Sequence, residues 1–477
     1  MLKHRHNLNN QKLPDMRPRM LMILAAAALM GSTGCLVGGK YSQPTLPNMP
    51  AQYAQPASAD TSALLSWFNL YGDTVLQRYI RTALDSNRNL LAAANRIEES
   101  REIAGLVRAN LYPAFGYQLQ AGGGQAGTDA RRLGAGVDGG ALRALGTLNW
   151  EIDLWGRIRN NNQAAYTRLL ADVDNRNALV VSLVAEIASQ YFLLRDLDNR
   201  LAVARRTLTV RQESARIIGE RFSKGYVAEV DKLQADQQAG LAAAAIPAFE
   251  RQIILVQNAI RTLMGLPPGP LERGDGLFAQ TVTPDIPAGL PSQLLQRRPD
   301  VREAERRLEA QFYSIGIARA NLYPQFSLTG VLGFASPQLS SLVGGSGFVA
   351  NGFAGLVGPI FQFGQNKRRV KVEEYRTKQL AYNYEQTVLR AMADVDNALA
   401  QYRTFNDEYR VRTELTQAAR KSLELTRAKY DYGYSSYYEV LIQENYLFDA
   451  ELAESVTFQQ RLNALVQLYK ALGGGWQ

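Results

Sequence analysis

The side chains that most often do chemistry in proteins are nearly absent from this sequence. Its two histidines are His4 and His6, and its one cysteine is Cys35. Histidine is the commonest general base and metal ligand, and a single thiol can form neither an intrachain disulfide nor a cluster of cysteine ligands. If the segment before Cys35 is removed, no histidine is left. The composition therefore predicts no catalytic site, no metal site and no cofactor.

The segment that holds both histidines has the form of a secretory signal. Arg17 and Arg19 precede an apolar run, and small residues lead from its end at Met30 to Cys35. A short apolar region behind positive charge is typical of a signal peptide and is too short to span a bilayer comfortably. Met16 or Met20 could be the true start. We expect residues 1–34 to be a signal peptide.

Cys35 closes the run Gly31-Ser32-Thr33-Gly34-Cys35, which resembles a bacterial lipobox. That resemblance implies that Cys35 is acylated, for example by palmitate, and becomes the first residue of a membrane-tethered chain. The alternative is an ordinary signal peptide followed by an incidental cysteine. The stretch after it is rich in Pro, Gln and Ser and has no periodicity, so residues 35–70 are expected to form an extended tether.

The overall charge gives no support for nucleic-acid binding. The formal net charge of +9 falls to +5 without residues 1–34, and the remaining basic residues form no block. A nucleic-acid surface needs concentrated positive charge. Hydrophobic residues make up 46% of the chain and charged residues 20%, which suffices for a folded core.

One six-residue segment, Arg-Ala-Asn-Leu-Tyr-Pro, occurs twice, at residues 108–113 and 319–324. Each copy ends a helical pattern and opens an alternation of apolar and polar residues. Proline stops a helix and disfavours helical geometry in the residue before it. Each copy therefore predicts a switch from helix to strand, and the recurrence predicts an internal duplication with a unit of about 210 residues.

Alternation after each switch predicts two β-hairpins, at residues 113–155 and 323–363. Their outer faces are apolar and aromatic, while the polar face of the first holds Glu151 and Asp153. The return strand of the second, Phe353 to Phe363, alternates poorly. Strands of about ten residues with this pattern are typical of transmembrane barrels. The alternative is a pair of hairpins on a soluble core.

Four strands cannot close a barrel, and an open sheet edge is untenable in lipid. We therefore expect an oligomer in which two, three or four protomers supply eight, twelve or sixteen strands. Glu151 and Asp153 would then face the barrel lumen.

Long helices are expected on both sides of the strands. The run from Arg157 to Phe222 contains no proline, keeps apolar residues in a seven-residue register and would span roughly 99 Å as a helix. The alternative is a core helix of a globular bundle, but such helices average about three turns. We expect long helical hairpins at 156–264 and 364–472. Shorter helical segments are expected at 71–112 and 299–322, a linker at 265–298 and a tail at 473–477.

Four segments resemble the TolC-like outer membrane factors of Gram-negative efflux pumps, specifically their OprM-type lipoprotein branch. They are Trp150-Glu151-Ile152-Asp153-Leu154-Trp155-Gly156-Arg157, Arg297-Arg298-Pro299-Asp300-Val301-Arg302, the second Asn-Leu-Tyr-Pro segment, and Leu468-Tyr469-Lys470-Ala471-Leu472-Gly473-Gly474-Gly475-Trp476.

The resemblance implies an α+β membrane protein built as a homotrimer. Twelve strands would form a transmembrane β-barrel that continues into a long periplasmic α-helical barrel. It also implies a lipid-anchored place in the outer membrane, a periplasmic adaptor protein and an inner-membrane, proton-driven transporter as partners.

The same resemblance implies two kinds of site. The helical hairpin tips would dock onto the adaptor, although their glycines could simply end helices. The matching tip positions are Arg221, Gly225, Tyr226, Val227, Lys429, Gly433, Tyr434 and Ser435. Acidic residues past the second tip would narrow the periplasmic entrance. Glu439 matches the first such position, the second is Ile442, and Glu444 is a further candidate or a solvated helix position.

The resulting hypothesis is a passive exit duct for toxic small molecules, without chemistry of its own. Two alternatives stay open: a duct for a secreted protein or for metal ions, and a structural tether of the cell envelope.

Overall fold

The computed structural model of the protein describes residues 37–44, 53–54, 71–122, 141–280, 294–336, 342 and 347–474. The predicted signal peptide, Cys35, most of the predicted tether and the last three residues lie outside this part. The chain forms two compact units. One comprises residues 1–42, 101–168 and 308–379, and the other residues 43–100, 169–307 and 380–477.

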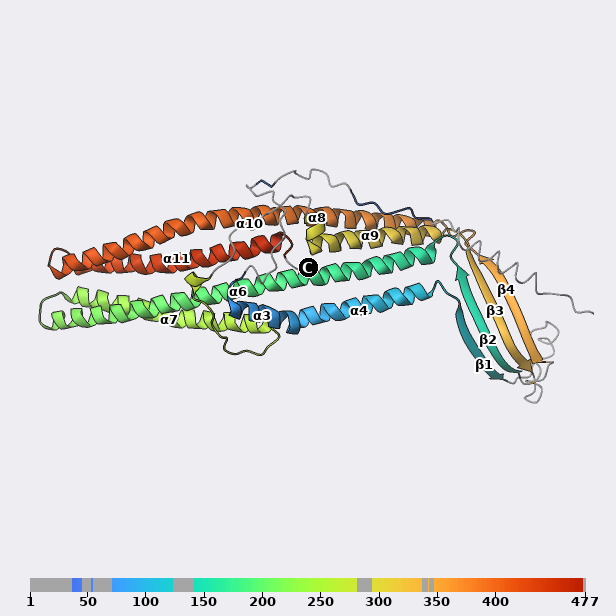
Figure 1. Ribbon diagram of the computed structural model, residues 1–477, viewed down its shortest axis with the longest axis horizontal. Helices are drawn as coiled ribbons and strands as arrows, with labels where there is room; N and C mark the ends of the chain where they lie inside the picture. Colours follow the sequence, from blue (N-terminus) through green and yellow to red (C-terminus); the bar gives the residue numbers. More distant parts are fainter. Residues whose placement is uncertain are drawn as a thin grey trace, which may run out of the picture. The chain divides into compact units, whose positions relative to one another are not determined.

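Helices and strands follow the order that the sequence predicts (Figure 1). The strands are β1 (Ala114–Gly122), β2 (Ala141–Ile152), β3 (Gln325–Ser336) and β4 (Phe348–Val357). The helices are α3 (Thr74–Ser86), α4 (Arg88–Ala109), α6 (Arg157–Ser223), α7 (Glu229–Leu263), the 3₁₀ turn η1 (Leu277–Ala279), α8 (Leu294–Arg297), α9 (Pro299–Ala320), α10 (Gln365–Asp431) and α11 (Tyr437–Ala471).

The first unit contains one curved antiparallel sheet in the order β1-β2-β3-β4 (Figure 1). Residues opposite one another in an antiparallel pair point to the same face. The register places Phe115 opposite Leu148, and Trp150 opposite Leu328, on a face that is apolar across all four strands. The opposite face aligns Thr147, Asn149 and Glu151 with residues such as Thr329 and Ser327. The predicted alternation is therefore confirmed.

The apolar face of the sheet is not covered by the rest of the described chain. Phe115 is 80% exposed and Tyr117 is 84% exposed. Apolar patches on this scale mark a surface that another molecule or a membrane covers. Within the described residues, β1 and β4 also each have one edge without a neighbouring strand.

Both Arg-Ala-Asn-Leu-Tyr-Pro segments are switches from helix to strand, as predicted. Helix α4 ends at Ala109 before β1, and α9 ends at Ala320 before β3. A tryptophan side chain is hydrogen-bonded to the backbone of each switch. The indole N–H of Trp150 donates to Leu111 O at 3.1 Å, and that of Trp155 donates to Pro324 O at 2.8 Å. The ring of Trp155 also stacks on that of Tyr323, with 4.7 Å between the ring centres.

Two strand boundaries differ from the prediction. The return strand β4 runs from Phe348 to Val357 instead of Phe353 to Phe363. Proline at residue 359 cannot donate to a ladder, so the strand ends just before it. Its start lies five residues earlier than predicted. Strand β2 ends at Ile152, so Asp153 does not belong to the alternating strand.

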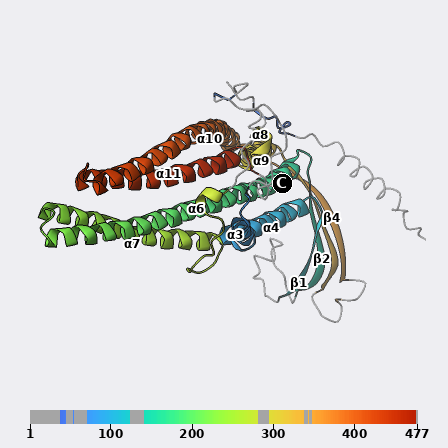
Figure 2. The same cartoon turned by 60° about the vertical axis from the view of Figure 1, so that its left-hand side comes forward.

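The second unit contains most of two long helical hairpins, in which α6 lies beside α7 and α10 beside α11 (Figures 1 and 2). The first residues of α6 and α10 belong to the first unit. Helices α6 and α10 each have 67 residues, and α7 and α11 each have 35. The predicted long helices are therefore confirmed. Two residues of the predicted heptad seam, Ile187 and Leu194, are fully buried.

A core of α3, α4, α6, α7, α11 and η1 residues holds the middle of this unit. Tyr191 and Phe192 of α6 lie at its centre, and Tyr71 packs edge to face on Phe192. Among the described residues, two helices, α6 and α7, are long and apolar enough to cross a membrane by length and composition alone. Of their apolar stretches, 50% is buried in α6 and 22% in α7.

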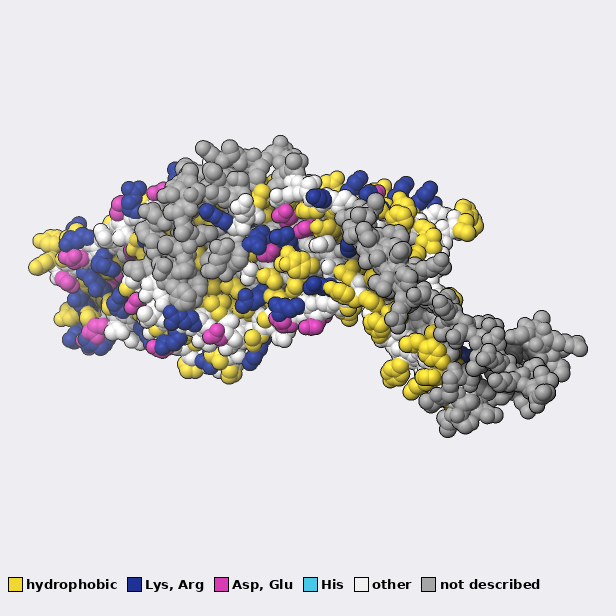
Figure 3. Space-filling view, turned by 45° about the vertical axis from the view of Figure 1, so that its right-hand side comes forward, with side chains coloured by type: hydrophobic (Ala, Val, Ile, Leu, Met, Phe, Trp, Pro, Cys, Tyr) yellow, Lys and Arg dark blue, Asp and Glu magenta, His cyan; other side chains and the backbone are white. Residues whose placement is uncertain are grey.

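Hydrophobic side chains also stay exposed between charged ones on the face drawn in Figure 3. On α7, Leu241, Ile254 and Leu255 are each more than half exposed. A helix that leaves apolar side chains outside its own hairpin has a second surface to cover.

Candidate functional site: the hairpin tips, the predicted entrance residues and the Asp73 clamp

Each hairpin tip is a helix end closed by a glycine. Gly225 and Gly433 have φ values of +75° and +78°, the left-handed conformation that favours glycine. The N–H of Tyr226 donates to Arg221 O at 2.9 Å, and the N–H of Tyr434 donates to Lys429 O at 2.8 Å. These are the bonds of a Schellman motif. The helix-ending role of both glycines is confirmed, and it leaves their neighbours projecting outward.

The tip side chains differ in what they contact. Tyr226 is 77% exposed and Tyr434 is 85% exposed, and Lys429 is also exposed. Arg221, in contrast, contacts the other hairpin. Its Nη1 donates to the hydroxyl of Tyr430 at 2.6 Å, and its guanidinium lies 5.3 Å from the centre of that ring.

A small core behind the tips joins α6, α7, α10 and α11. Ile218, Leu423 and Tyr437 are buried there together. Burial, aided by the charge of Glu444, raises the pKa of Tyr437 to about 12, so its phenol stays neutral. The two tips therefore form one continuous surface in this unit.

Glu439 lies in the first turn of α11 with an exposed side chain. Its carboxylate accepts from the hydroxyl of Ser435 at 2.7 Å, while the N–H of Glu439 donates to Ser436 Oγ at 3.4 Å. This is the pattern of a capped helix start, in which an acidic residue also favours the N-terminal end of the helix dipole. Glu439 thus keeps a solvent-facing carboxylate.

Glu444 is not the solvated helix residue that the sequence allowed. It is 6% exposed, and its carboxylate pairs with Arg427 of α10. Packing of α11 against α10 buries this side chain next to Arg427. Its Oε1 accepts from Arg427, while its Oε2 is buried without a hydrogen-bond partner among the described residues.

A second glutamate of α11, one heptad further on, also lies between arginines. Glu451 pairs with Arg206 of α6 at 2.6 Å and with Arg420 of α10 at 2.9 Å. Arg211 of α6 adds a buried contact, donating to Gln238 O and to Asn445 Oδ1. These polar links tie the two hairpins together behind the tips. The seven-residue spacing of 444 and 451 was visible in the sequence, but their partners were not.

The acidic residues predicted for the lumen are both paired. Glu151 of β2 accepts two hydrogen bonds from Arg157, at 2.6 and 3.0 Å. Asp153 accepts from the backbone N–H groups of Ile158 and Arg159 and thereby caps the start of α6. Glu151 and Asp153 both belong to the first unit, and their hydrogen bonds hold the turn from β2 to α6 at Gly156.

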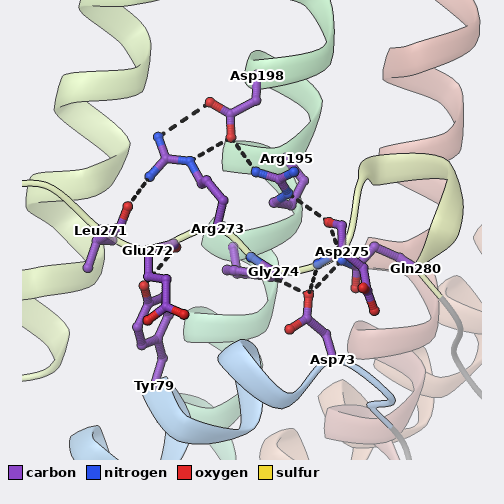
Figure 4. A network of polar contacts seen from close by, with 11 residues as sticks. Asp73, Tyr79, Arg195, Asp198, Leu271, Glu272, Arg273, Gly274, Asp275 and Gln280 are labelled. Carbon is purple, nitrogen blue, oxygen red and sulfur yellow. Dashed lines mark hydrogen bonds and ion pairs between the residues drawn. The ribbon is translucent and has the colours of Figure 1, made fainter.

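A clamp at mid-height of the second unit is built on Asp73, which sequence reasoning missed (Figure 4). Asp73 is the N-cap of α3, a position that favours Asp. Its Oδ2 accepts from the hydroxyl of Tyr191 at 2.6 Å, from Gln280 Nε2 at 2.8 Å and from the N–H of Asp275 at 3.0 Å. Its Oδ1 accepts from the N–H groups of Val75 and Leu76.

The segment at residues 271–280 is held by this clamp. Arg273 pairs with Asp198 of α6 at 2.7 Å, and Arg195 donates to Asp275 O at 2.9 Å (Figure 4). A Cβ at Gly274 would lie 2.3 Å from the Asp73 carboxylate, so only glycine fits there. A local N-cap signal marks Asp73 in the sequence, but nothing marks its distant partners.

Arg298 forms a second clamp, where α9, α10 and α11 meet. It is buried, pairs with both oxygens of Asp300 and reaches Asp394 of α10 at 3.1 Å. Its Nη1 also donates to Ala471 O near the end of α11, at 3.1 Å. The Arg-Arg-Pro-Asp segment was recognised in the sequence, but this role was not.

No group of three or more His, Cys, Asp or Glu residues is placed to hold a metal ion in the described part of the chain. The arrangement offers a sheet with one apolar and one polar face, long amphipathic helices and exposed tips. Such a molecule can span a membrane with its sheet, line a passage with its polar faces and dock onto another protein with its tips.

Comparisons with known proteins agree with this geometry. Residues 79–266 and 290–474 match the family described as "Outer membrane efflux protein". The cation efflux system protein CusC of Escherichia coli O6:H1 is 30% identical, over 96% of this chain and 99% of its own. The solvent efflux pump outer membrane protein SrpC of Pseudomonas putida is 31% identical, over 94% of this chain and 97% of its own.

The solved structures include the open state of the MtrE outer membrane channel of Neisseria gonorrhoeae. It superposes with a TM-score of 0.84 at 29% identity, over 93% of this chain and 99% of the other. These relatives are outer membrane channels of the TolC-like fold, not enzymes, in agreement with the scarcity of chemically active side chains. The chain belongs to the outer membrane efflux protein family.

Proposed function

We propose that the protein is the outer membrane exit duct of a tripartite, proton-driven efflux pump and conducts toxic small molecules passively to the exterior. The observation that carries this proposal is the open sheet. It has an uncovered apolar face, a polar opposite face and two unpaired edges among the described strands. Lipid tolerates no open edge, so the sheets of several protomers must join.

Three protomers are the number that the family resemblance implies, and they would close a twelve-stranded barrel. The exposed apolar side chains of α7 support contacts between protomers along the helices. The two separate matches to one family, together with helices of equal length in both halves, support an internal duplication. Acylation at Cys35 would add a lipid anchor in the same membrane.

The tips are proposed to bind a periplasmic adaptor protein. Tyr226 and Tyr434 are exposed aromatic side chains on rigid turns, which is the kind of residue that dominates binding energy at interfaces. Arg221, Gly225, Gly433, Val227 and Ser435 would shape the turns around them, and Lys429 would stay at the rim.

Replacing both tip tyrosines by serine is expected to abolish pump function while the duct itself still folds. Loss of such an aromatic contact costs about 2 kcal/mol, or roughly thirtyfold in affinity per site. Sensitivity of cells to toxic compounds would be compared for Tyr226→Ser/Tyr434→Ser and for Tyr382→Ser, an exposed tyrosine of α10 away from the tips. Full resistance with the double variant would show that the tips do not carry the adaptor contact.

Glu439 is proposed to narrow the periplasmic entrance as one of three converging carboxylates. Like charges around one axis attract cations and repel anions. Glu439→Gln keeps a side chain that suits the helix start but removes the charge. The cation preference of single channels should fall several-fold, whereas Glu424→Ala, at an exposed position of α10, should leave it unchanged. An unchanged preference in Glu439→Gln would remove Glu439 from the entrance.

The duct itself is tested by conductance and by deletion. The purified protein in planar bilayers should conduct ions, and deletion of the gene should sensitise cells to several unrelated toxic compounds. Because a closed entrance would silence the wild type, Glu439→Gln is measured beside it. If neither conducts, the protein is a structural tether. Sensitivity to metal ions alone, or loss of one secreted protein, would favour the other two candidate cargoes.

A further inference from the structure

The start of helix α10 carries four basic side chains without a partner among the residues that the structure describes. Lys367, Arg368, Arg369 and Lys371 are exposed, and their side chains make no hydrogen bond or ion pair within the described part of the chain. Lys367 and Arg368 lie in the first turn, where the helix dipole disfavours positive charge. The fold therefore bears a local electrostatic cost without an internal compensation.

The nearest acidic residues on the same helix are already engaged. Glu373 accepts from Gln311 of α9 and pairs with Arg376. Glu374 pairs with Arg319 at 2.9 Å. Neither carboxylate is thus available to the four cations.

The corresponding positions of the first hairpin, 208 residues earlier, show the opposite arrangement. There, Arg157 pairs with Glu151 and Arg159 pairs with Asp153. The residues 208 positions after these two acids are Pro359 and Phe361. The second hairpin therefore has neither of these two acidic residues at the matching positions, and it carries more cations there than the first.

An exposed apolar knuckle stands directly before these cations. Ile360, Phe361 and Phe363 are 102%, 73% and 86% exposed, and the rings of Phe361 and Phe363 contact each other at 4.6 Å. Phe363 has a φ of +48°, a strained conformation for a residue other than glycine. The backbone thus turns at the point where the apolar side chains give way to basic ones.

The neighbourhood of α10 places this segment beside the sheet. Asn366 Nδ2 donates to Asn321 O, in the switch between α9 and β3, at 3.1 Å. If the apolar face of the sheet lies in lipid, the knuckle stands at the edge of the hydrocarbon and the cations at the headgroups. Apolar side chains followed by unpaired Lys and Arg are the pattern of an interfacial anchor.

We propose that residues 360–371 bind the headgroups of anionic phospholipids in the periplasmic leaflet of the outer membrane. The knuckle inserts at the headgroup boundary, and the four cations pair with the lipid phosphates. These phosphates supply the negative charge that the described part of the chain does not provide there. The site rests on the membrane placement of the sheet, which is part of the proposed function.

The test uses the full-length protein in phosphatidylcholine nanodiscs with spin-labelled lipids. The wild type should restrict labelled phosphatidylglycerol at least threefold more than labelled phosphatidylcholine, since one basic residue next to an anionic leaflet contributes about fivefold. High salt should weaken the preference. In the triple variant Arg368→Gln/Arg369→Gln/Lys371→Gln, the ratio of restricted phosphatidylglycerol to restricted phosphatidylcholine should fall close to one.

Two further variants make the result specific. Arg390→Gln/Arg403→Gln/Arg410→Gln removes as much charge from exposed positions further along α10 and should keep the preference. Arg368→Lys/Arg369→Lys should keep it as well, because point charges suffice for a headgroup.

An absent preference in the wild type, or an equal loss in the distant triple variant, would overturn the lipid site. The first result would also leave an acidic protein as the partner of the cations. Conductance of the same preparation separates this outcome from failure of the duct. A protein that conducts without a lipid preference refutes only the lipid site, and one that prefers phosphatidylglycerol without conducting refutes only the duct.

Discussion

Asp73→Ala is expected to destabilise the protein by about 3–5 kcal/mol, because it leaves several buried donors without an acceptor at once. The carboxylate is 3% exposed and accepts from the side chains of Tyr191 and Gln280 and from three backbone N–H groups. The segment at 271–280 should detach first. Thermal unfolding in detergent and hydrogen exchange of that segment would measure both effects.

The pH dependence of the same site has a defined sign. Burial alone would raise the pKa of Asp73, but hydrogen bonds from Gln280, Tyr191 and the N–H groups of Leu76 and Val75 lower it below its ordinary value of 3.8. A depressed carboxylate pKa stabilises the fold above pH 3.8, and this stability is lost as the pH falls through the folded-state value. The Asp73→Asn variant cannot titrate at this position, so it should lack the part of the free energy of unfolding that the wild type loses at acidic pH.

Two controls accompany these variants. Asp85→Ala, at an exposed position of the same helix, should change stability by less than about 0.5 kcal/mol. Asp73→Asn should cost less than Asp73→Ala, since its one oxygen can still accept from either group of donors. Equal stability of Asp73→Ala and the wild type would mean that water replaces the carboxylate at no cost, and the clamp would not hold the linker.

Arg298→Ala should destabilise the protein by about 3–5 kcal/mol, the cost of removing one partner from a buried charged network. Arg298 contacts Asp300, Asp394 and the end of α11. Its loss leaves Asp300 without its bidentate partner and removes the guanidinium that donates to Ala471 O. A lowered unfolding temperature of the purified protein is the expected readout.

Arg298→Lys separates charge from geometry in that network. A lysine retains one positive charge but cannot form the planar pair with Asp300 and also reach Ala471 O, so an intermediate loss is expected. Arg390→Ala, an exposed arginine of α10, serves as the control and should leave the unfolding temperature unchanged. If Arg298→Ala and Arg390→Ala behave alike, the three helices are held by packing alone.

Much of the architecture follows from local rules that act within a few residues. Proline at 113 and 324 ends a helix whatever surrounds it, and alternation with a period of two selects one face of a strand. Glycine at 225 and 433 permits the left-handed turn that reverses a hairpin. Such signals are local, so the switches, the first three strands, the long helices and the tips could be predicted, whereas the bounds of β4 were predicted wrongly.

The placement of polar side chains depended on partners that are distant in the sequence. Asp73 carries an N-cap signal, but its acceptor role toward Gln280 depends on how a linker about two hundred residues away folds back over α6. Glu444 and Glu439 look alike as acidic residues of one helix. Helix packing buries the first against Arg427 and leaves the second in solvent.

The sequence by itself determined most of the strands, helices and turns, because backbone preferences and periodicity are local properties of the chain. It misplaced β4, where the alternation is poor. Only the tertiary structure decided which charges are paired. It paired Glu151 with Arg157 and Asp153 with Arg159, and it gave the cations at the start of α10 no counterion within the described part of the chain. The physical reason is that a charge interacts with whatever the fold brings within a few ångströms, and that neighbourhood is set by packing across the whole unit.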